Sequence, residues 1–88
     1  MGVYNLSFKP SVEKDLRKIP STLSRVILQK IEQLSQNPIS PKTIKLAGGD
    51  NFYRIRVGDY RVIYSVDHPT QQVIIHYVRH RREVYRSL

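Results

Sequence analysis

The chain has no cysteine, few carboxylates and no long apolar stretch, and each of these absences removes a class of protein. Without cysteine, neither a disulfide nor a thiolate metal site can stabilise the fold, which fits a reducing compartment. No window approaches the roughly 18 apolar residues that a membrane span requires, and residues 1–9 lack the pattern of a secretory signal peptide. We therefore expect a soluble, cytoplasmic protein with no membrane partner.

The scarcity of carboxylates leaves a strongly basic chain. Fifteen Lys and Arg side chains stand against seven Asp and Glu, which gives a formal net charge of +8 and an isoelectric point near 10.1. This balance favours nucleic acid or an acidic protein as the partner. All six lysines lie at or before Lys45, whereas seven of the nine arginines lie at or after Arg54. A chain of 88 residues has room for one hydrophobic core, so we expect residues 1–88 to form a single domain.

The N-terminal half has the pattern of a short strand followed by two helices. Apolar residues alternate over residues 4–8, as in a strand with one buried face, and recur at helical spacing over residues 10–19. Pro20 ends that helix, and Ser21 or Thr22 can cap a second one. The buried face of the strand should carry Tyr4, Leu6 and Phe8, and the apolar stripe of the second helix should comprise Leu23, Val26, Ile27, Ile31 and Leu34.

The C-terminal half supplies the sheet that such a helical hairpin needs. Three strand-like runs follow one another, at Phe52–Val57, Tyr60–Asp67 and Gln72–Arg79. Short turn sequences separate them, Gly58-Asp59 first and residues 68–71 second. We therefore predict an α+β fold of order β-α-α-β-β-β, in which an antiparallel meander packs on the helical hairpin and a short basic segment ends the chain.

The first turn is expected to place arginines directly opposite each other on neighbouring strands. Glycine at the first position of the two-residue loop Gly58-Asp59 suits a type II′ turn, which would make Arg56 face Arg61 across two strands. Like charges directly opposite destabilise a sheet by up to about 1 kcal/mol, and Arg54 lies on the same face. An anion would relieve this repulsion, and phosphate is the anion best matched to several guanidinium groups. The sequence therefore predicts a phosphate-binding site at these three arginines.

Three runs of the sequence, at residues 46–49, 53–64 and 80–86, together with the order of elements, resemble the RelE/ParE superfamily of bacterial and archaeal toxins. The resemblance covers nearly the whole chain. It implies the toxin of a type II toxin–antitoxin system, and RelE-type members cut messenger RNA in the ribosomal A site until an antitoxin covers their basic surface. It further implies cleavage by attack of the ribose 2′-hydroxyl on phosphate, without metal or cofactor, leaving a 2′,3′-cyclic phosphate.

The same resemblance implies particular site residues. Catalytic positions of the RelE branch fall on Arg54, Arg56, Arg61, Arg81 and Tyr85. The first two are commonly lysine in the well-known ribosome-dependent enzymes, and an arginine, unlike a crowded lysine, does not lose its proton. Further contacts with messenger and ribosomal RNA are expected from Arg79, Arg82, Arg86 and Lys45.

Proton transfer needs another group, and histidine is one candidate. Neighbouring cations would keep His80 neutral, so it could act as the base, although a solvated loop residue is the simpler interpretation. Tyr85 could stack on a base, move a proton or pack the C-terminal segment. His76 reads as a structural residue in a strand and His68 as a turn residue. Neither the histidines nor the carboxylates have the spacing of metal ligands.

Two other functions remain open at this stage. The first is a ParE-like inhibitor of DNA gyrase, a non-nuclease on the same fold. The second is an inactive module that binds RNA or antitoxin, in which arginine in place of lysine marks lost catalysis.

Overall fold

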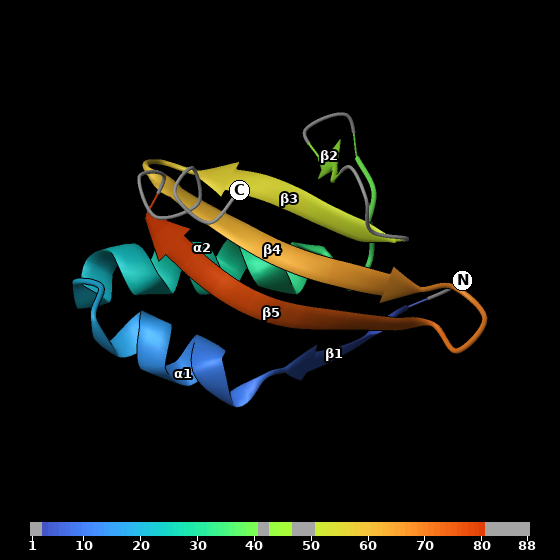
Figure 1. Ribbon diagram of the computed structural model, residues 1–88, viewed down its shortest axis with the longest axis horizontal. Coiled ribbons are helices and arrows are strands. Elements are labelled where there is room, and N and C mark those ends of the chain that lie inside the picture. The colour runs from blue at the N-terminus through green and yellow to red at the C-terminus, as the bar shows by residue number, and fades with distance from the viewer. Residues whose placement is uncertain (1–2, 41–42, 47–50, 81–88) are drawn as a thin grey trace.

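A five-stranded sheet carries two helices on one face (Figure 1). The computed structural model describes residues 3–40, 43–46 and 51–80. Its elements are β1 (Asn5–Phe8), α1 (Pro10–Arg17), α2 (Ser21–Gln33), β2 (Ile44–Lys45), β3 (Phe52–Val57), β4 (Tyr60–Asp67) and β5 (Gln72–His80). The predicted α+β order is confirmed, with β3 and β4 at the expected bounds, β5 one residue longer, and the two-residue β2 in addition.

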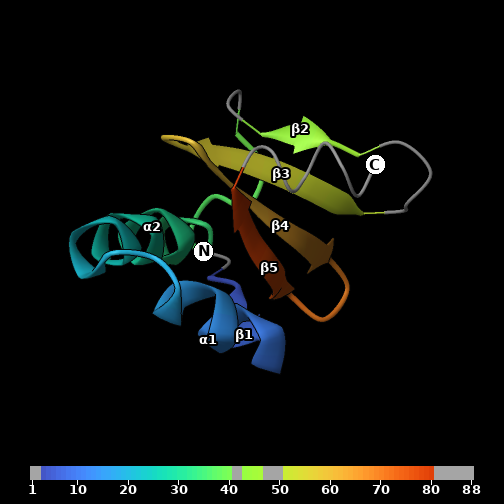
Figure 2. The same ribbon diagram turned by 60° about the vertical axis from the view of Figure 1, so that its left-hand side comes forward.

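The strands lie in the order β1-β5-β4-β3-β2. β1 pairs with β5 in parallel, and the other neighbours pair antiparallel. Figure 2 shows both helices on one side of the sheet, with α1 nearest to β1 and β5 and with β2 at the opposite edge. Within the described ranges, neither helix has the length and apolar character needed to cross a membrane.

The core lies between α2 and alternate residues of the three long strands. Tyr64 is fully buried at its centre, and its hydroxyl donates a hydrogen bond to the Pro38 carbonyl oxygen at 2.6 Å. Burial raises the pKa of Tyr64 because the phenolate would lose its hydration. The other large buried side chains include Val12, Ile27, Ile31, Val62, Val66, Val73 and Ile75.

The predicted apolar stripe of α2 is only partly buried. Ile27, Ile31 and Leu34 enter the core, but Leu23 and Val26 are each 43% exposed. Leu23 lies in the first turn of α2, which projects past the end of the sheet, and Val26 is turned by about 100° from its buried neighbour (Figure 1).

Two smaller expectations are wrong. Phe8, the last residue of the edge strand β1, is exposed. The residue before α2 is Pro20, so neither Ser21 nor Thr22 caps the helix, and no side chain hydrogen-bonds to its first turn as a cap.

Side chains of α1 continue the hydrogen bonding of β5 where β1 ends. β1 pairs only with the first four residues of β5. Beyond them, Ser11 Oγ donates to the His76 carbonyl oxygen at 2.7 Å, and a carboxylate oxygen of Asp15 accepts from the Val78 N–H at 3.1 Å. Asp15 also accepts from the Arg79 guanidinium. The helix thereby satisfies backbone groups that an unpaired edge would leave open.

Candidate nucleic-acid interface

Three arginines lie side by side across the three long strands. Arg56 of β3 is directly opposite Arg61 of β4, and Arg61 is directly opposite Arg79 of β5. We call these residues the arginine row. Directly opposite side chains share a sheet face with Cβ atoms about 4.5–5.5 Å apart, so the three charges are close neighbours. The pairing of Arg56 with Arg61 is confirmed, whereas the third member was not expected to lie in line with them.

The turn that sets this register has the predicted chemistry. Gly58 has a φ of 59°, and Asp59 is not among the residues with positive φ, which fits a type II′ turn. A Cβ atom added at Gly58 would meet nothing within 4 Å. Glycine is therefore required here by its backbone conformation and not by crowding.

The carbonyl oxygen of Gly58 lies between the two facing arginines. It accepts a hydrogen bond from Arg56 Nε at 3.2 Å and one from Arg61 Nη1 at 3.5 Å, and Arg61 Nη1 also donates to the Tyr60 carbonyl oxygen at 3.3 Å. Arg61 is only 7% exposed, whereas Arg56 is exposed. The partial negative charge of turn carbonyls thus offsets part of the expected repulsion and fixes the buried guanidinium in place.

Arginines of this face differ in their access to carboxylates. In the described part of the chain the ion pairs are Arg17 with Glu13 and Arg79 with Asp15. Arg54, Arg56 and Arg61 therefore have no carboxylate partner among the described residues. Their positive charge is not neutralised by a described carboxylate, whereas that of Arg79 is partly neutralised.

Arg79, which was expected to bind RNA, has a structural role in addition. Its guanidinium reaches the 7% exposed Asp15 on α1 and also lies 5.1 Å from the centre of the Tyr77 ring, in cation–π contact. Sequence reasoning missed Asp15, which looks like an ordinary acidic residue in the second half of a helix. Its i, i+3 spacing from Val12, a fully buried residue, was the available signal.

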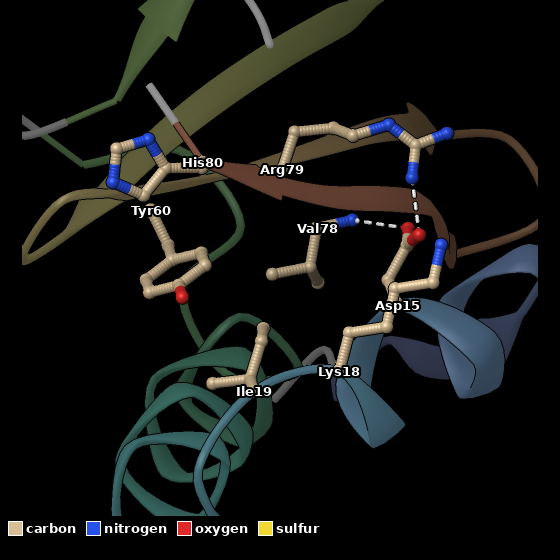
Figure 3. A pocket seen from close by; sticks show the side chains of 7 residues that line it. All are labelled: Asp15, Lys18, Ile19, Tyr60, Val78, Arg79 and His80. Carbon is tan, nitrogen blue, oxygen red and sulfur yellow. Dashed lines mark hydrogen bonds and ion pairs between the residues drawn. The ribbon is translucent and has the colours of Figure 1, made fainter. Parts of the chain in front are cut away.

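The sheet separates His80 from Arg56 and Arg61. His80 is directly opposite Tyr60, and their rings meet edge to face with centroids 5.4 Å apart. Because successive residues of a strand point to opposite faces, His80 shares the sheet face of Tyr60 and Arg79 that of Arg61. His80 borders a cleft of about 100 Å³, lined by Asp15, Lys18, Ile19, Tyr60, Val78 and Arg79 as well. Figure 3 shows His80 and Arg79 beside the cleft that they help to line.

Lys45 is on the helix side. It is exposed in β2 and pairs with Tyr53, while its neighbour Ile44 pairs with Arg54. The register thus keeps Lys45 apart from the arginines. The remaining candidates, Arg81, Arg82, Tyr85 and Arg86, lie outside the described residues.

The other two histidines have hydrogen-bond partners. His76 Nε2 and Ser65 Oγ lie 2.9 Å apart, and burial, followed by the nearby charge of Lys9, lowers the pKa of His76. His68 Nδ1 lies 2.8 Å from the Tyr4 hydroxyl. Among residues 3–40, 43–46 and 51–80, no three His, Cys, Asp or Glu side chains cluster closely enough to hold a metal ion.

Comparison with known proteins identifies related toxins. Residues 6–85 match the sequence model of the ParE toxin of the type II toxin–antitoxin system parDE. The toxin RelE3 of Methanocaldococcus jannaschii is 34% identical over 82 residues, covering 89% of this chain and 91% of that protein. The toxin RelG of Mycobacterium tuberculosis is 30% identical over 87 residues, covering 94% and 97%.

Solved structures of the same kind share the fold. The archaeal RelE–RelB complex from Pyrococcus horikoshii matches with a TM-score of 0.79 at 33% identity, over 90% of this chain and 96% of that one. The isolated RelE toxin of E. coli matches with a TM-score of 0.76 at 26% identity, over 97% and 99%. These matches define a class, the toxins of type II toxin–antitoxin systems. The chain belongs to the RelE/ParE toxin superfamily, as its sequence motifs had suggested.

Proposed function

We propose that this toxin cleaves messenger RNA in the ribosomal A site and thereby inhibits translation. The observation that supports this most directly is the set of three arginines, Arg54, Arg56 and Arg61, on one sheet face without a carboxylate partner among the described residues. Such a set costs stability unless it binds an anion, and a phosphodiester offers the geometry that guanidinium groups match best.

In the proposed reaction, the 2′-oxygen of a ribose attacks the adjacent phosphorus and the bond from phosphorus to the 5′-oxygen breaks. The 2′-hydroxyl proton passes to a base, the leaving 5′-oxygen takes up a proton, and a 2′,3′-cyclic phosphate remains. The arginines stabilise the charge that develops on the phosphate. Arg61 is suited to this task because its guanidinium is already fixed by the turn carbonyls and needs no reorganisation.

The base must be a group other than these arginines, because a guanidinium stays protonated at physiological pH. His80 was one candidate, but it lies across the sheet from Arg56 and Arg61. We therefore assign proton transfer to Tyr85, on the strength of the family resemblance, with Arg81 as a further phosphate ligand, or to a group of the ribosome. Positioning and charge stabilisation supply the rest of the rate.

We further propose that a cognate antitoxin silences the protein by covering, with an acidic segment, the sheet face that carries Arg54, Arg56 and Arg61. We call this surface the arginine face. Related toxins are found with their antitoxins in the RelE–RelB complexes from Pyrococcus horikoshii and Methanococcus jannaschii. The net charge of +8 favours an acidic partner. Complex formation should slow amide hydrogen exchange in β3, and unchanged exchange there would place the inhibitor elsewhere, such as on the helical hairpin.

The decisive experiment maps the 5′ ends of cellular messages after brief induction of the toxin. Ribosome-dependent cleavage predicts cuts in phase with codons, and purified ribosomes programmed with a defined message should show the same cuts. Arg54→Ala should weaken binding to the programmed ribosome and lower the slope of log K against log salt by somewhat under one unit. An unchanged affinity and slope in this variant would argue against phosphate contact at the arginine face.

A second candidate is supported by the family match itself, because the matched description is that of a ParE toxin. Inhibition of DNA gyrase would produce DNA breaks that depend on gyrase, and no codon-phased cuts. A protein that only binds RNA or antitoxin would produce neither. The same induction experiment therefore separates all three functions.

A further inference from the structure

Rings from two non-adjacent strands meet on the face that carries the arginine row. Phe52 of β3 and His76 of β5 have ring centroids 4.9 Å apart, and the His76 and Tyr77 centroids are 6.4 Å apart. We call Phe52, His76 and Tyr77 the ring cluster. The residue between the two strands is Ser65 of β4, which pairs with Phe52 and is small enough to let the rings meet above it.

The rings of the ring cluster are held in place by contacts with one another and with Ser65, but they do not belong to the core. Ser65 Oγ holds His76 Nε2 at 2.9 Å, which fixes the imidazole against Phe52. None of the three rings is part of the buried cluster under the helices, and Tyr77 remains 41% exposed. Tyr77 also packs against the Arg79 guanidinium, which orients its ring without covering it.

The ring cluster borders the arginines directly. Phe52 precedes Arg54 by two residues and Tyr77 precedes Arg79 by two, so the Cα atom of each ring residue lies about 7 Å along its strand from that of an arginine on the same face. Aromatic rings next to arginines on one sheet face match the two parts of a single-stranded RNA, its bases and its phosphates.

We propose that the ring cluster is a stacking site for one unpaired RNA base, adjacent to the nucleotide whose phosphate lies on Arg54 and Arg56. This inference rests on the proposed function, since it assumes that RNA lies along the arginine face. It adds a second contact along the course of the RNA over the arginine face. This contact would hold a base by its π face, whichever base it is.

The test titrates the full chain with a single-stranded RNA hexamer at low salt and follows the ring protons of Phe52 and Tyr77 by NMR. Stacking should move these signals upfield through the ring current of the base. A hexamer of the same length with abasic riboses is the matched probe, and it should bind through its phosphates without moving them. Tyr77→Ala should weaken binding of the intact hexamer by roughly 5- to 100-fold and binding of the abasic hexamer hardly at all. Tyr77→Phe keeps the ring and should bind like the unmodified protein.

The outcomes separate this inference from the function on which it rests. If Arg54→Ala weakens binding of both hexamers while Tyr77→Ala affects neither, RNA binds the arginines and the stacking site is wrong. If neither hexamer binds the unmodified protein, both the stacking site and the RNA path are wrong. Amide spectra of Tyr77→Ala establish that it is folded, and Tyr77→Phe would reveal a loss caused by the hydroxyl alone.

Discussion

The β3–β4 hairpin and the strand β5 differ in how their registers are set. In the hairpin, a two-residue turn fixes every pair back to Phe52 and Ser65. β5 pairs with the same β4, but its register shifts by one residue between Ile63 and Tyr64. Before the shift Tyr64 pairs with Ile75, and after it Ile63 pairs with Tyr77. The register of the hairpin is therefore set locally by its turn. The register of β5 against β4 is changed by a bulge that lies far from any turn.

The bulge decides which side chains join the arginine row. With strict alternation from the buried Ile75, residue 79 would face the helices and residue 80 would face the arginines. The extra residue at His76 exchanges them, so Arg79 faces Arg61 and His80 faces Tyr60. In this register His80 does not share a sheet face with Arg56 and Arg61.

The largest expected effect is on cleavage activity, and it compares substitutions on the two faces of the sheet. Arg61→Gln should slow single-turnover cleavage on programmed ribosomes by about 10²–10³-fold, as the loss of one fixed donor to a developing charge does. His80→Ala should leave both the rate and its pH profile unchanged because the residue lies across the sheet. A loss of about 10²–10⁴-fold in His80→Ala, with the limb of the profile near pH 6.5 flattened, would restore His80 as the base.

A smaller effect concerns the attachment of β5 to α1. Asp15→Asn should lower the free energy of unfolding by about 2–4 kcal/mol, because it leaves a partly buried Arg79 without its counter-charge. Urea denaturation measures this. Glu13→Gln is the matched control on the same helix, since its pair with Arg17 is exposed and contributes below about 0.5 kcal/mol. Equal effects of the two changes would mean that the buried ion pair adds nothing.

The hairpin should respond to its turn residue. Gly58→Ala should destabilise the protein by about 1–2 kcal/mol, because an L side chain is strained at positive φ. Gly58→Asn should cost less, since asparagine tolerates this region better. Thermal unfolding of both variants provides the measurement. Because a Cβ atom finds open space here, a much larger loss in Gly58→Ala would point to an additional contact at the turn.

Replacing each of the two facing arginines should affect the stability of the protein differently. Arg56→Gln should raise the free energy of unfolding by up to about 1 kcal/mol at low salt, with the gain shrinking as salt screens the repulsion. Arg61→Gln should not stabilise, because Arg61 is buried and donates to two carbonyl oxygens. Denaturant midpoints at low and high salt test this. Stabilisation by both changes would show that repulsion outweighs the hydrogen bonds.

The smallest effect is a pH dependence from His76. Burial holds the folded-state pKa of His76 below its ordinary value, so the unfolded chain binds a proton more readily. Stability should therefore be retained above about pH 6.5 and decline as the pH falls below it. His76→Gln should remove this part of the slope, which denaturation across pH 5–8 can measure. A slope that is the same in His76→Gln would assign it to other groups.

These comparisons show what sequence reasoning could predict and where it stopped. Turn chemistry and alternation predicted β3, β4, their register and the facing pair of Arg56 and Arg61. The parallel pairing of β1 with β5 and the capping of β5 by Asp15 depend on contacts between distant segments, which carry no local signal. The bulge at His76 lies within an ordinary strand sequence, so the sequence did not indicate that Arg79 faces Arg61 and His80 faces Tyr60.

The side chains of α1 that complete the ladder of β5 also bear on how this protein behaves at high concentration. An exposed strand edge is a template on which other chains can add, and this leads to aggregation. Ser11 and Asp15 occupy backbone groups of β5 that a second chain would otherwise pair with. Loss of α1 from the sheet would leave the backbone groups of His76 and Val78 unpaired at the edge of β5, so loosening of this helix should be the first step toward insoluble assemblies when the toxin is overproduced.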